Sequence, residues 1–241
     1  MFAPNLGWPS FDLKTPLEKA TGLPVELENA ANACALAELW FGQYAQGVRN
    51  LVAVTVSEGI GAGLILNHQL IRGSNGLAGE FGHTTLVEDG IECGCGNRGC
   101  WEVYASNSAA VRYYEGQVLR ARNSRARNGS AGPVPRFDDV LRLAEQNDLK
   151  AVEAIDTMAH YLGAGLALLV TSLAPDVIVL IGEVTRLWNR VGPIIDQVIK
   201  ERSFTHAATR IVPTDPGTQP RLRGTVPLVL QKHFGLSLIH I

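Results

Sequence analysis

Three of the four cysteines in this chain, Cys93, Cys95 and Cys100, lie within a single stretch of eight residues. Disulfide scaffolds spread an even set of cysteines over a short secreted chain, whereas a tight cluster in a chain of 241 residues favours metal binding. His83 precedes the cluster and adds an imidazole to the three thiols. Nitrogen and sulfur are the atoms that Zn²⁺ takes in tetrahedral sites, so the pattern predicts a zinc site of these four residues. Because the protein fills all four positions, the predicted zinc is structural rather than catalytic.

The glycines around the cysteines support this prediction. Gly94 lies between Cys93 and Cys95, where a tight turn is needed, and Gly96 and Gly99 let the backbone curl back toward Cys100. The alternative is three free cysteines in a loop. Cys34 lies among alanines in a predicted helix, which is typical of a small buried apolar residue rather than a fifth ligand.

The bulk composition limits the classes of function. A hydrophobic fraction of 46% over 241 residues suffices for one large domain or two small ones. No signal peptide and no run of about 20 apolar residues is present, so we expect a cytoplasmic protein without a membrane partner. The net charge of −2 means that the chain as a whole lacks the excess of basic residues that is typical of nucleic-acid-binding domains. The arginines between residues 120 and 136 are more typical of a solvated mobile loop than of a nucleic-acid patch.

Hydrophobic periodicity predicts an alternation of helices and strands. We expect helices over residues 12–22, 29–43, 102–120, 137–145, 149–173, 184–201 and 222–234. We expect strands over residues 23–27, 51–56, 64–66, 70–71, 177–181 and 210–212, and irregular chain from 73 to 100. Such alternation indicates the α/β class.

The residues from Asn75 to His83, followed by Cys-Gly-Cys-Gly-Asn-Arg-Gly-Cys-Trp-Glu at 93–102, resemble the signature of the ROK family of repressors and sugar kinases. Further matches run from residues 5–8 to residues 222–224. The resemblance implies an actin-like ATPase (ribonuclease H-like) fold that holds a sugar between two lobes. It implies that this chain is mainly the larger C-terminal lobe with its zinc-binding loop, without the first lobe's phosphate loop or a regulator's winged helix.

The resemblance also suggests a division of the chain. Residues 1–30 would be a remnant of the N-terminal lobe and the hinge, 31–221 the sugar-binding and zinc lobe, and 222–235 a closing helix. One codon choice for residues 236–241 spells a common sequencing adapter, so we interpret them as an artefact, with a natural apolar tail as the alternative.

Sugar-contacting residues follow from the same resemblance. They are Asn29, Asn75, Gly76, Glu80, His83 and Glu102. Carboxylates accept hydrogen bonds from sugar hydroxyls, and an amide both donates and accepts. His83 can use one ring nitrogen for zinc and the other for the sugar. Asn29 is alternatively a helix N-cap, a role compatible with sugar contact, and Glu80 and Glu102 are alternatively solvated charges.

The sequence differs from the kinases of the family at three positions, and each difference bears on kinase activity. Kinases of the family carry an Asp after the Asn to accept the sugar's proton, and here that position is Ala30, so no catalytic base is present there. Glu58 stands in the segment that resembles the phosphate-binding loop, and Glu183 stands in the adenosine-contact segment.

We therefore expect a sugar-sensing effector domain of a ROK-family transcriptional regulator, with a sugar or phosphosugar as its ligand. DNA would be bound only through a winged helix that precedes this chain, and the family resemblance implies a homodimer or tetramer. The alternative is an ATP- and Mg²⁺-dependent sugar kinase of the glucokinase or N-acylhexosamine kinase class. A sugar-binding pseudo-enzyme without a DNA role is a third class.

Overall fold

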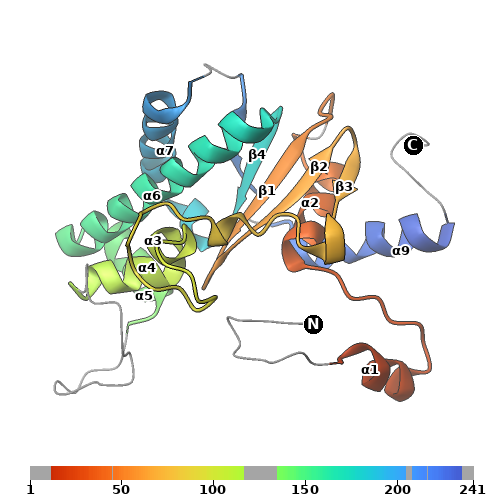
Figure 1. The fold of residues 1–241 in the computed structure, drawn as a ribbon. Helices are drawn as coiled ribbons and strands as arrows, with labels where there is room; N and C mark the ends of the chain where they lie inside the picture. Colours follow the sequence, from red (N-terminus) through yellow and green to blue (C-terminus); the bar gives the residue numbers. More distant parts are fainter. Residues whose placement is uncertain (1–11, 45, 117–134, 205–207, 216, 235–241) are drawn as a thin grey trace.

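The computed structural model describes residues 12–44, 46–116, 135–204, 208–215 and 217–234. The predicted loop at 122–135, apart from Pro135, and the predicted artefact at 236–241 lie outside these residues. The described chain forms a mixed sheet with helices on both faces (Figure 1). This arrangement confirms the α/β prediction.

The sheet has five described strands in the order β3-β2-β1-β4-β5. Their bounds are β1 Leu51–Val56, β2 Ile60–Leu66, β3 Gln69–Ile71, β4 Val177–Ile181 and β5 Arg210–Pro213. β1, β2 and β3 pair antiparallel, whereas β4 and β5 run parallel to β1. Every residue of β1 and β4 is buried, which explains why both read as continuous apolar runs.

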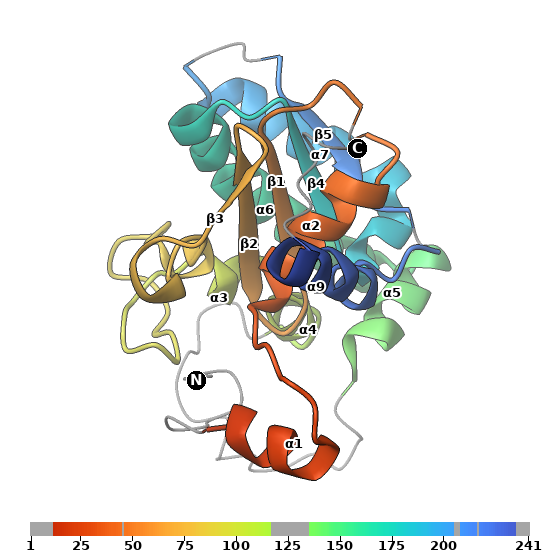
Figure 2. The same cartoon turned by 90° about the vertical axis from the view of Figure 1, so that its right-hand side faces the viewer.

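Successive residues of the central strand face two different hydrophobic clusters. Val52, Val54 and Val56 belong to the larger cluster, which includes α3 Glu102–Ala105, α4 Asn107–Tyr114, α5 Phe137–Glu145, α6 Leu149–Leu173 and α7 Trp188–Arg202. Leu51 and Ala53 belong to the smaller cluster under α2 Ala30–Phe41. α8 Pro220–Arg223 and α9 Thr225–Phe234 pack on α2, on that same side (Figure 2).

α6 is the one helix of the described segments that is long and apolar enough to cross a membrane by length and composition. Its most apolar window is 67% buried inside the fold. It packs against α3, α4, α5 and α7, as a central core helix does. This agrees with the sequence prediction of a buried helix there.

The predicted strand at 23–27 is wrong. That stretch pairs with no described strand and connects α1 Lys14–Thr21 to α2, with the backbone N–H of Val25 bonded to the Glu18 carboxylate. α1 buries none of its residues and lies apart from the sheet and its helices (Figures 1 and 2). A short apolar run forms a strand only where a neighbouring strand takes up its backbone hydrogen bonds.

Three predicted helices are interrupted. The helix expected from 102 breaks at Ser106, whose side chain caps α4 by accepting from the backbone N–H of Ala109. The helix expected from 184 begins as a 3₁₀ turn, Glu183–Leu187, before α7. The closing helix is broken between α8 and α9 at Gly224, where an added Cβ would lie 1.8 Å from the carbonyl oxygen of Ala33.

β2 begins four residues earlier than expected, and its glycines explain why. A Cβ on Gly63 would lie 2.2 Å from the carbonyl oxygen of Ala31 in the first turn of α2. On the neighbouring segment, a Cβ on Gly79 would lie 1.9 Å from the carbonyl oxygen of Ala62. These glycines belong to close backbone approaches rather than to turns alone. They bring the start of α2 and the segment from Gly79 against the same strand.

Candidate metal centre and the polar residues around it

The structure brings the four predicted metal ligands together. The nitrogen of His83 and the sulfurs of Cys93, Cys95 and Cys100 all lie within 4.8 Å of one another. Cys95 Sγ is 3.7 Å from Cys100 Sγ, and Cys93 Sγ is 3.6 Å from His83 Nδ1. Tetrahedral zinc would set about 3.8 Å between two sulfurs and about 3.5 Å between sulfur and nitrogen, so these donors fit such an ion.

His83 is oriented by the 3₁₀ turn Phe81–His83. A Cβ on Gly82 would lie 2.2 Å from the carbonyl oxygen of Ile60, so this turn packs directly on β2. The ring directs Nδ1 toward the cluster and Nε2 toward the Glu80 carboxylate, at 3.9 Å. The two ring nitrogens therefore face the metal cluster and the predicted sugar-binding side, respectively.

Two aromatic residues hold the cysteine loop against α6 and α3. Trp101 is 1% exposed and donates through Nε1 to the carbonyl oxygen of Tyr161. Its indole covers Gly165, one turn further along α6. The Tyr104 hydroxyl accepts from the backbone N–H of Ile91 at 2.7 Å. Neither residue is among the site residues predicted from the sequence, although a Trp directly after the last cysteine is a visible signal.

Glu102 faces the metal cluster more closely than the sequence prediction of a sugar contact suggests. It is 7% exposed, and its Oε1 accepts from Cys93 Sγ at 3.1 Å and lies 3.5 Å from His83 Nδ1. Burial raises the pKa of the Cys100 thiol to about 11, and burial likewise raises the pKa of Cys93. Metal ligation requires thiolates, so binding of an ion here releases protons.

Asn29 and Ala30 stand exposed at the start of α2. Asn29 is the N-cap, and its Oδ1 accepts from the backbone N–H of Ala31 at 2.8 Å. The capping alternative from the sequence is therefore confirmed. Because the cap uses the oxygen, the Nδ2 group is the part of this amide that remains to donate to a ligand.

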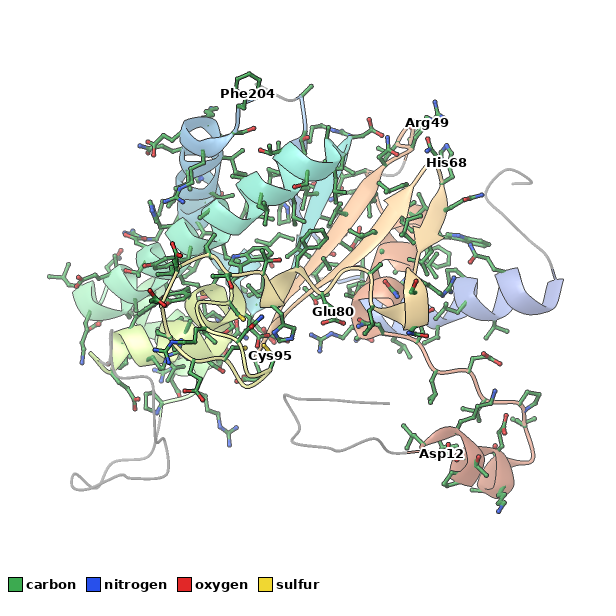
Figure 3. All side chains as sticks on the ribbon, in the orientation of Figure 1. Asp12, Arg49, His68, Glu80, Cys95 and Phe204 are labelled. Atoms are coloured by element: carbon green, nitrogen blue, oxygen red, sulfur yellow. The ribbon has the colours of Figure 1, made fainter. Side chains whose placement is uncertain are left out.

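The other predicted sugar residues lie in exposed turns. Asn75 and Gly76 belong to the 3₁₀ turn Ser74–Gly76, in which both have positive φ. The backbone N–H of Ala78 closes this turn by donating to the carbonyl oxygen of Arg72 at 2.9 Å. Glu80 is exposed, and in the view of Figure 3 both Glu80 and Cys95 lie near the middle of the molecule. No hydrogen bond joins Asn29, Asn75 and Glu80 to one another in the described chain.

Glu58 and Glu183 lie in the segments that resemble the phosphate and adenosine contacts of the family's kinases, and both carboxylates are held near the end of β1. Glu58 Oε2 accepts from the Ser108 hydroxyl at 2.5 Å, and Glu183 Oε2 accepts from Asn107 Nδ2 at 3.1 Å. The backbone N–H of Asn107 donates to the carbonyl oxygen of Ser57 at 2.8 Å. The start of α4 thus connects the loop after β1 with the loop after β4.

The fold and this cluster define an α/β protein of the actin-like ATPase class with a histidine–cysteine group that could hold a metal ion. The family model of the ROK family matches residues 1–232. The chain belongs to the ROK family.

Relatives of two kinds are similar to this chain. A glucokinase of Halalkalibacterium halodurans is 36% identical over 211 residues, covering 87% of this chain and 62% of the relative. A xylose repressor of Bacillus subtilis is 37% identical over 236 residues, covering 97% of this chain and 57% of the relative. The chain therefore spans about three fifths of the length of these relatives.

A solved ROK family glucokinase from Streptomyces griseus, in complex with glucose and AMPPNP, is also similar. It superimposes with a TM-score of 0.81 at 34% identity and covers 94% of this chain and 75% of that one. The near-equal identities to a kinase and a repressor establish the family but do not distinguish its two branches.

Proposed function

We propose that this chain is the sugar-sensing effector part of a ROK-family transcriptional regulator and does not transfer phosphate. The observation that carries the proposal is the first residue of α2, Ala30, at the position where the family's kinases carry the proton-accepting Asp. A methyl side chain cannot accept the proton of an attacking hydroxyl.

The nearest carboxylate in the sequence does not replace that base. Glu28 Oε1 accepts from the backbone N–H of Asn29 and from Asn32 Nδ2, and its Oε2 accepts from Arg72 Nε at 2.8 Å. Both oxygens of this carboxylate are held by donors of the protein itself, so neither is directed at an attacking hydroxyl. This arrangement supports an inactive phosphoryl-transfer site.

The nucleotide side supports the same proposal. Glu58 and Glu183 place two carboxylates in segments that resemble phosphate and adenosine contacts. Phosphoryl transfer depends on stabilising negative charge on the phosphates, and carboxylates there oppose it.

The proposed ligand is a monosaccharide or its phosphate. Asn29, Asn75, Gly76, Glu80, His83 and Glu102 are the proposed contacts. Zinc in the His83–Cys93–Cys95–Cys100 cluster would fix the ring of His83 by ligating Nδ1, which leaves Nε2 protonated and available to a sugar hydroxyl or to Glu80. Glu102 is proposed to contact the sugar as well as the cluster, where its Oε1 lies 3.5 Å from His83 Nδ1.

The remaining parts of the proposal concern the whole protein. We propose residues 31–221 as the sugar and zinc lobe, 222–235 as the closing helix, and 1–30 as the end of the first lobe with its hinge. DNA would be contacted by a winged helix outside residues 1–241, in a cytoplasmic homodimer or tetramer. Sugar binding would alter DNA affinity by favouring one of two lobe arrangements.

The second candidate is an ATP- and Mg²⁺-dependent hexose or N-acetylhexosamine kinase. The similarity to glucokinases favours it. It requires a proton acceptor other than residue 30.

The test is a phosphoryl-transfer assay of the complete gene product with Mg-ATP and common hexoses and N-acetylhexosamines, repeated on the variant Ala30→Asp. We expect no turnover by the parent, while calorimetry detects sugar binding and the sugar changes DNA affinity. Turnover gained by Ala30→Asp would identify the absent base as the limiting feature. Clear turnover by the parent would refute the regulator proposal and favour the kinase.

A further inference from the structure

The Glu28 carboxylate, in the segment that leads into α2, accepts three hydrogen bonds. Its Oε1 accepts from the backbone N–H of Asn29 at 3.0 Å and from Asn32 Nδ2 at 2.9 Å. Its Oε2 accepts from Arg72 Nε at 2.8 Å. One carboxylate therefore joins two segments that are 44 residues apart in the chain.

The two segments are those that carry proposed sugar contacts. On one side, Glu28 holds the peptide N–H of Asn29 itself, and Asn32, which is 2% exposed, fixes the carboxylate from inside the helix. On the other side, the carbonyl oxygen of Arg72 closes the turn that presents Asn75 and Gly76. The ion pair thus sets the distance between Asn29 and the base of this turn.

The burial of Glu28 distinguishes this ion pair from an ordinary surface pair. The side chain of Glu28 is 15% exposed, whereas that of Glu26, paired with Lys14 on the same connecting stretch, is 36% exposed. Exposed pairs contribute little because water competes for both partners. Three donors hold this nearly buried carboxylate in one geometry, because hydrogen bonds to a charged group are strong where water competes little for them.

We propose that Glu28 is a positioning residue for sugar binding that acts through Asn29 and Arg72. This inference rests on the proposed function. The Oδ1 of Asn29 is committed to the helix cap, so its Nδ2 must reach the sugar from a fixed backbone. Glu28 fixes that backbone, and its ion pair with Arg72 fixes the position of the opposite turn relative to Asn29.

The experiment is calorimetric titration of the complete zinc-loaded gene product with D-glucose and D-xylose. The variants are Glu28→Gln, Asn29→Ser and the double variant. Gln retains the size of Glu but places an N–H₂ against donors, while Ser at position 29 retains the cap oxygen and removes the amide. Glu26→Gln is the matched control, because it removes the same charge two residues away.

We expect Glu28→Gln to weaken sugar binding about tenfold, the loss typical of one charged hydrogen bond, and Glu26→Gln to bind as the parent does. Because Glu28 acts through Asn29, adding Glu28→Gln to the Asn29→Ser variant should reduce sugar affinity by a smaller factor than adding it to the parent. A purely structural role would give losses that multiply in the double variant. Arg72→Lys, at an exposed position, should also weaken sugar binding. It tests the same Glu28–Arg72 contact if Glu28→Gln does not fold.

The outcomes separate the two proposals. Two outcomes would overturn the positioning role alone, provided that the parent binds sugar. Either Glu28→Gln binds sugar with the affinity of the parent, or the losses of sugar affinity in Glu28→Gln and Asn29→Ser multiply fully in the double variant. Failure of the parent to bind either sugar would overturn the proposed sugar ligand and this inference with it.

Discussion

Single glycines decide which backbones approach one another around the metal cluster and the start of α2. Gly63 admits the carbonyl of Ala31, Gly79 admits that of Ala62, and Gly165 admits the indole of Trp101. The Trp101 contact shows the effect most clearly, because Tyr161 and Gly165 lie on the same face of α6. The first receives the indole hydrogen bond and the second provides the space for the ring.

The variant Gly165→Ala should therefore destabilise the protein. An added Cβ would lie 2.0 Å from the ring of Trp101, which is buried and cannot move without displacing the cysteine loop. We expect a loss of about 2 kcal/mol in the free energy of unfolding, the usual cost of overpacking, measured by urea denaturation.

Gly217→Ala is the control for this prediction. Among the described residues, an added Cβ there would meet only Asp215 Oδ1, at an ordinary 3.6 Å. We expect a change within about 0.5 kcal/mol. Equal stability of Gly165→Ala and the parent would show that Trp101 does not pack as the structure has it.

At the scale of elements, α2 is held by polar contacts at both ends. Its first turn carries the Asn29 cap and the Glu28 contacts. Near its other end, Glu38 is 5% exposed and accepts from the Thr214 hydroxyl, which follows β5. A buried carboxylate at the second contact makes the attachment of α2 dependent on pH.

The variant Glu38→Gln tests this dependence. Burial raises the pKa of Glu38, although the hydrogen bond from Thr214 opposes the shift. The folded state then binds this proton more tightly than the unfolded state, so the ionised form costs stability once the pH passes the unfolded pKa. We expect the unfolding free energy of Glu38→Gln, relative to the parent, to increase as the pH rises from about 4 toward neutrality.

The measurement is chemical denaturation at a series of pH values. Glu153→Gln, at an exposed position of α6, is the control and should show a relative stability that does not follow this course. A relative stability of Glu38→Gln that stays constant or decreases with pH would contradict the assigned cause.

The whole molecule combines a sheet with buried helices and a cysteine loop that has little regular structure. Residues 84–101 contain no helix or strand, only the isolated bridges Thr85–Cys100 and Glu92–Arg98. The loop is attached to the core through Trp101 and Tyr104. Its order should depend on the proposed zinc ion, whereas that of the sheet should not.

Removal of zinc by a chelator should therefore produce local rather than global opening. We expect faster amide hydrogen exchange over residues 84–101, with the amides of β1 and β4 still protected. Cys95→Ser should lose bound zinc, whereas Cys34→Ala, outside the cluster, should retain it in elemental analysis. Uniform loss of protection, or zinc retained in full by Cys95→Ser, would contradict this division of the molecule.

The metal ligands and much of the core could be predicted from the sequence because their signals are local. β1, β4, α5 and α6 have the bounds expected from apolar runs and periodicity. The four predicted metal ligands share one short segment, and the structure brings them together. An Asn directly before a predicted helix also gave the N-cap alternative for Asn29, which the structure confirms.

Other features depended on contacts between distant segments. The apolar run at 23–27 predicts a strand, but none of the described strands pairs with it. The sequence predicts that the second strand begins at residue 64, but β2 begins at Ile60, and its glycines lie in the strand because α2 packs on them. Glu102 was assigned to the sugar, whereas its closest contacts are to Cys93 and His83.

The sequence by itself determined the family, the residues of the candidate metal site and the principal helices and strands, since spacing and periodicity within a segment encode them. Only the tertiary structure decided the strand order and the contacts of Glu28 with Arg72. It also decided the direction in which Glu102 points. These depend on which segments meet in space, and a side chain's partner 44 residues away leaves no periodic trace in the chain.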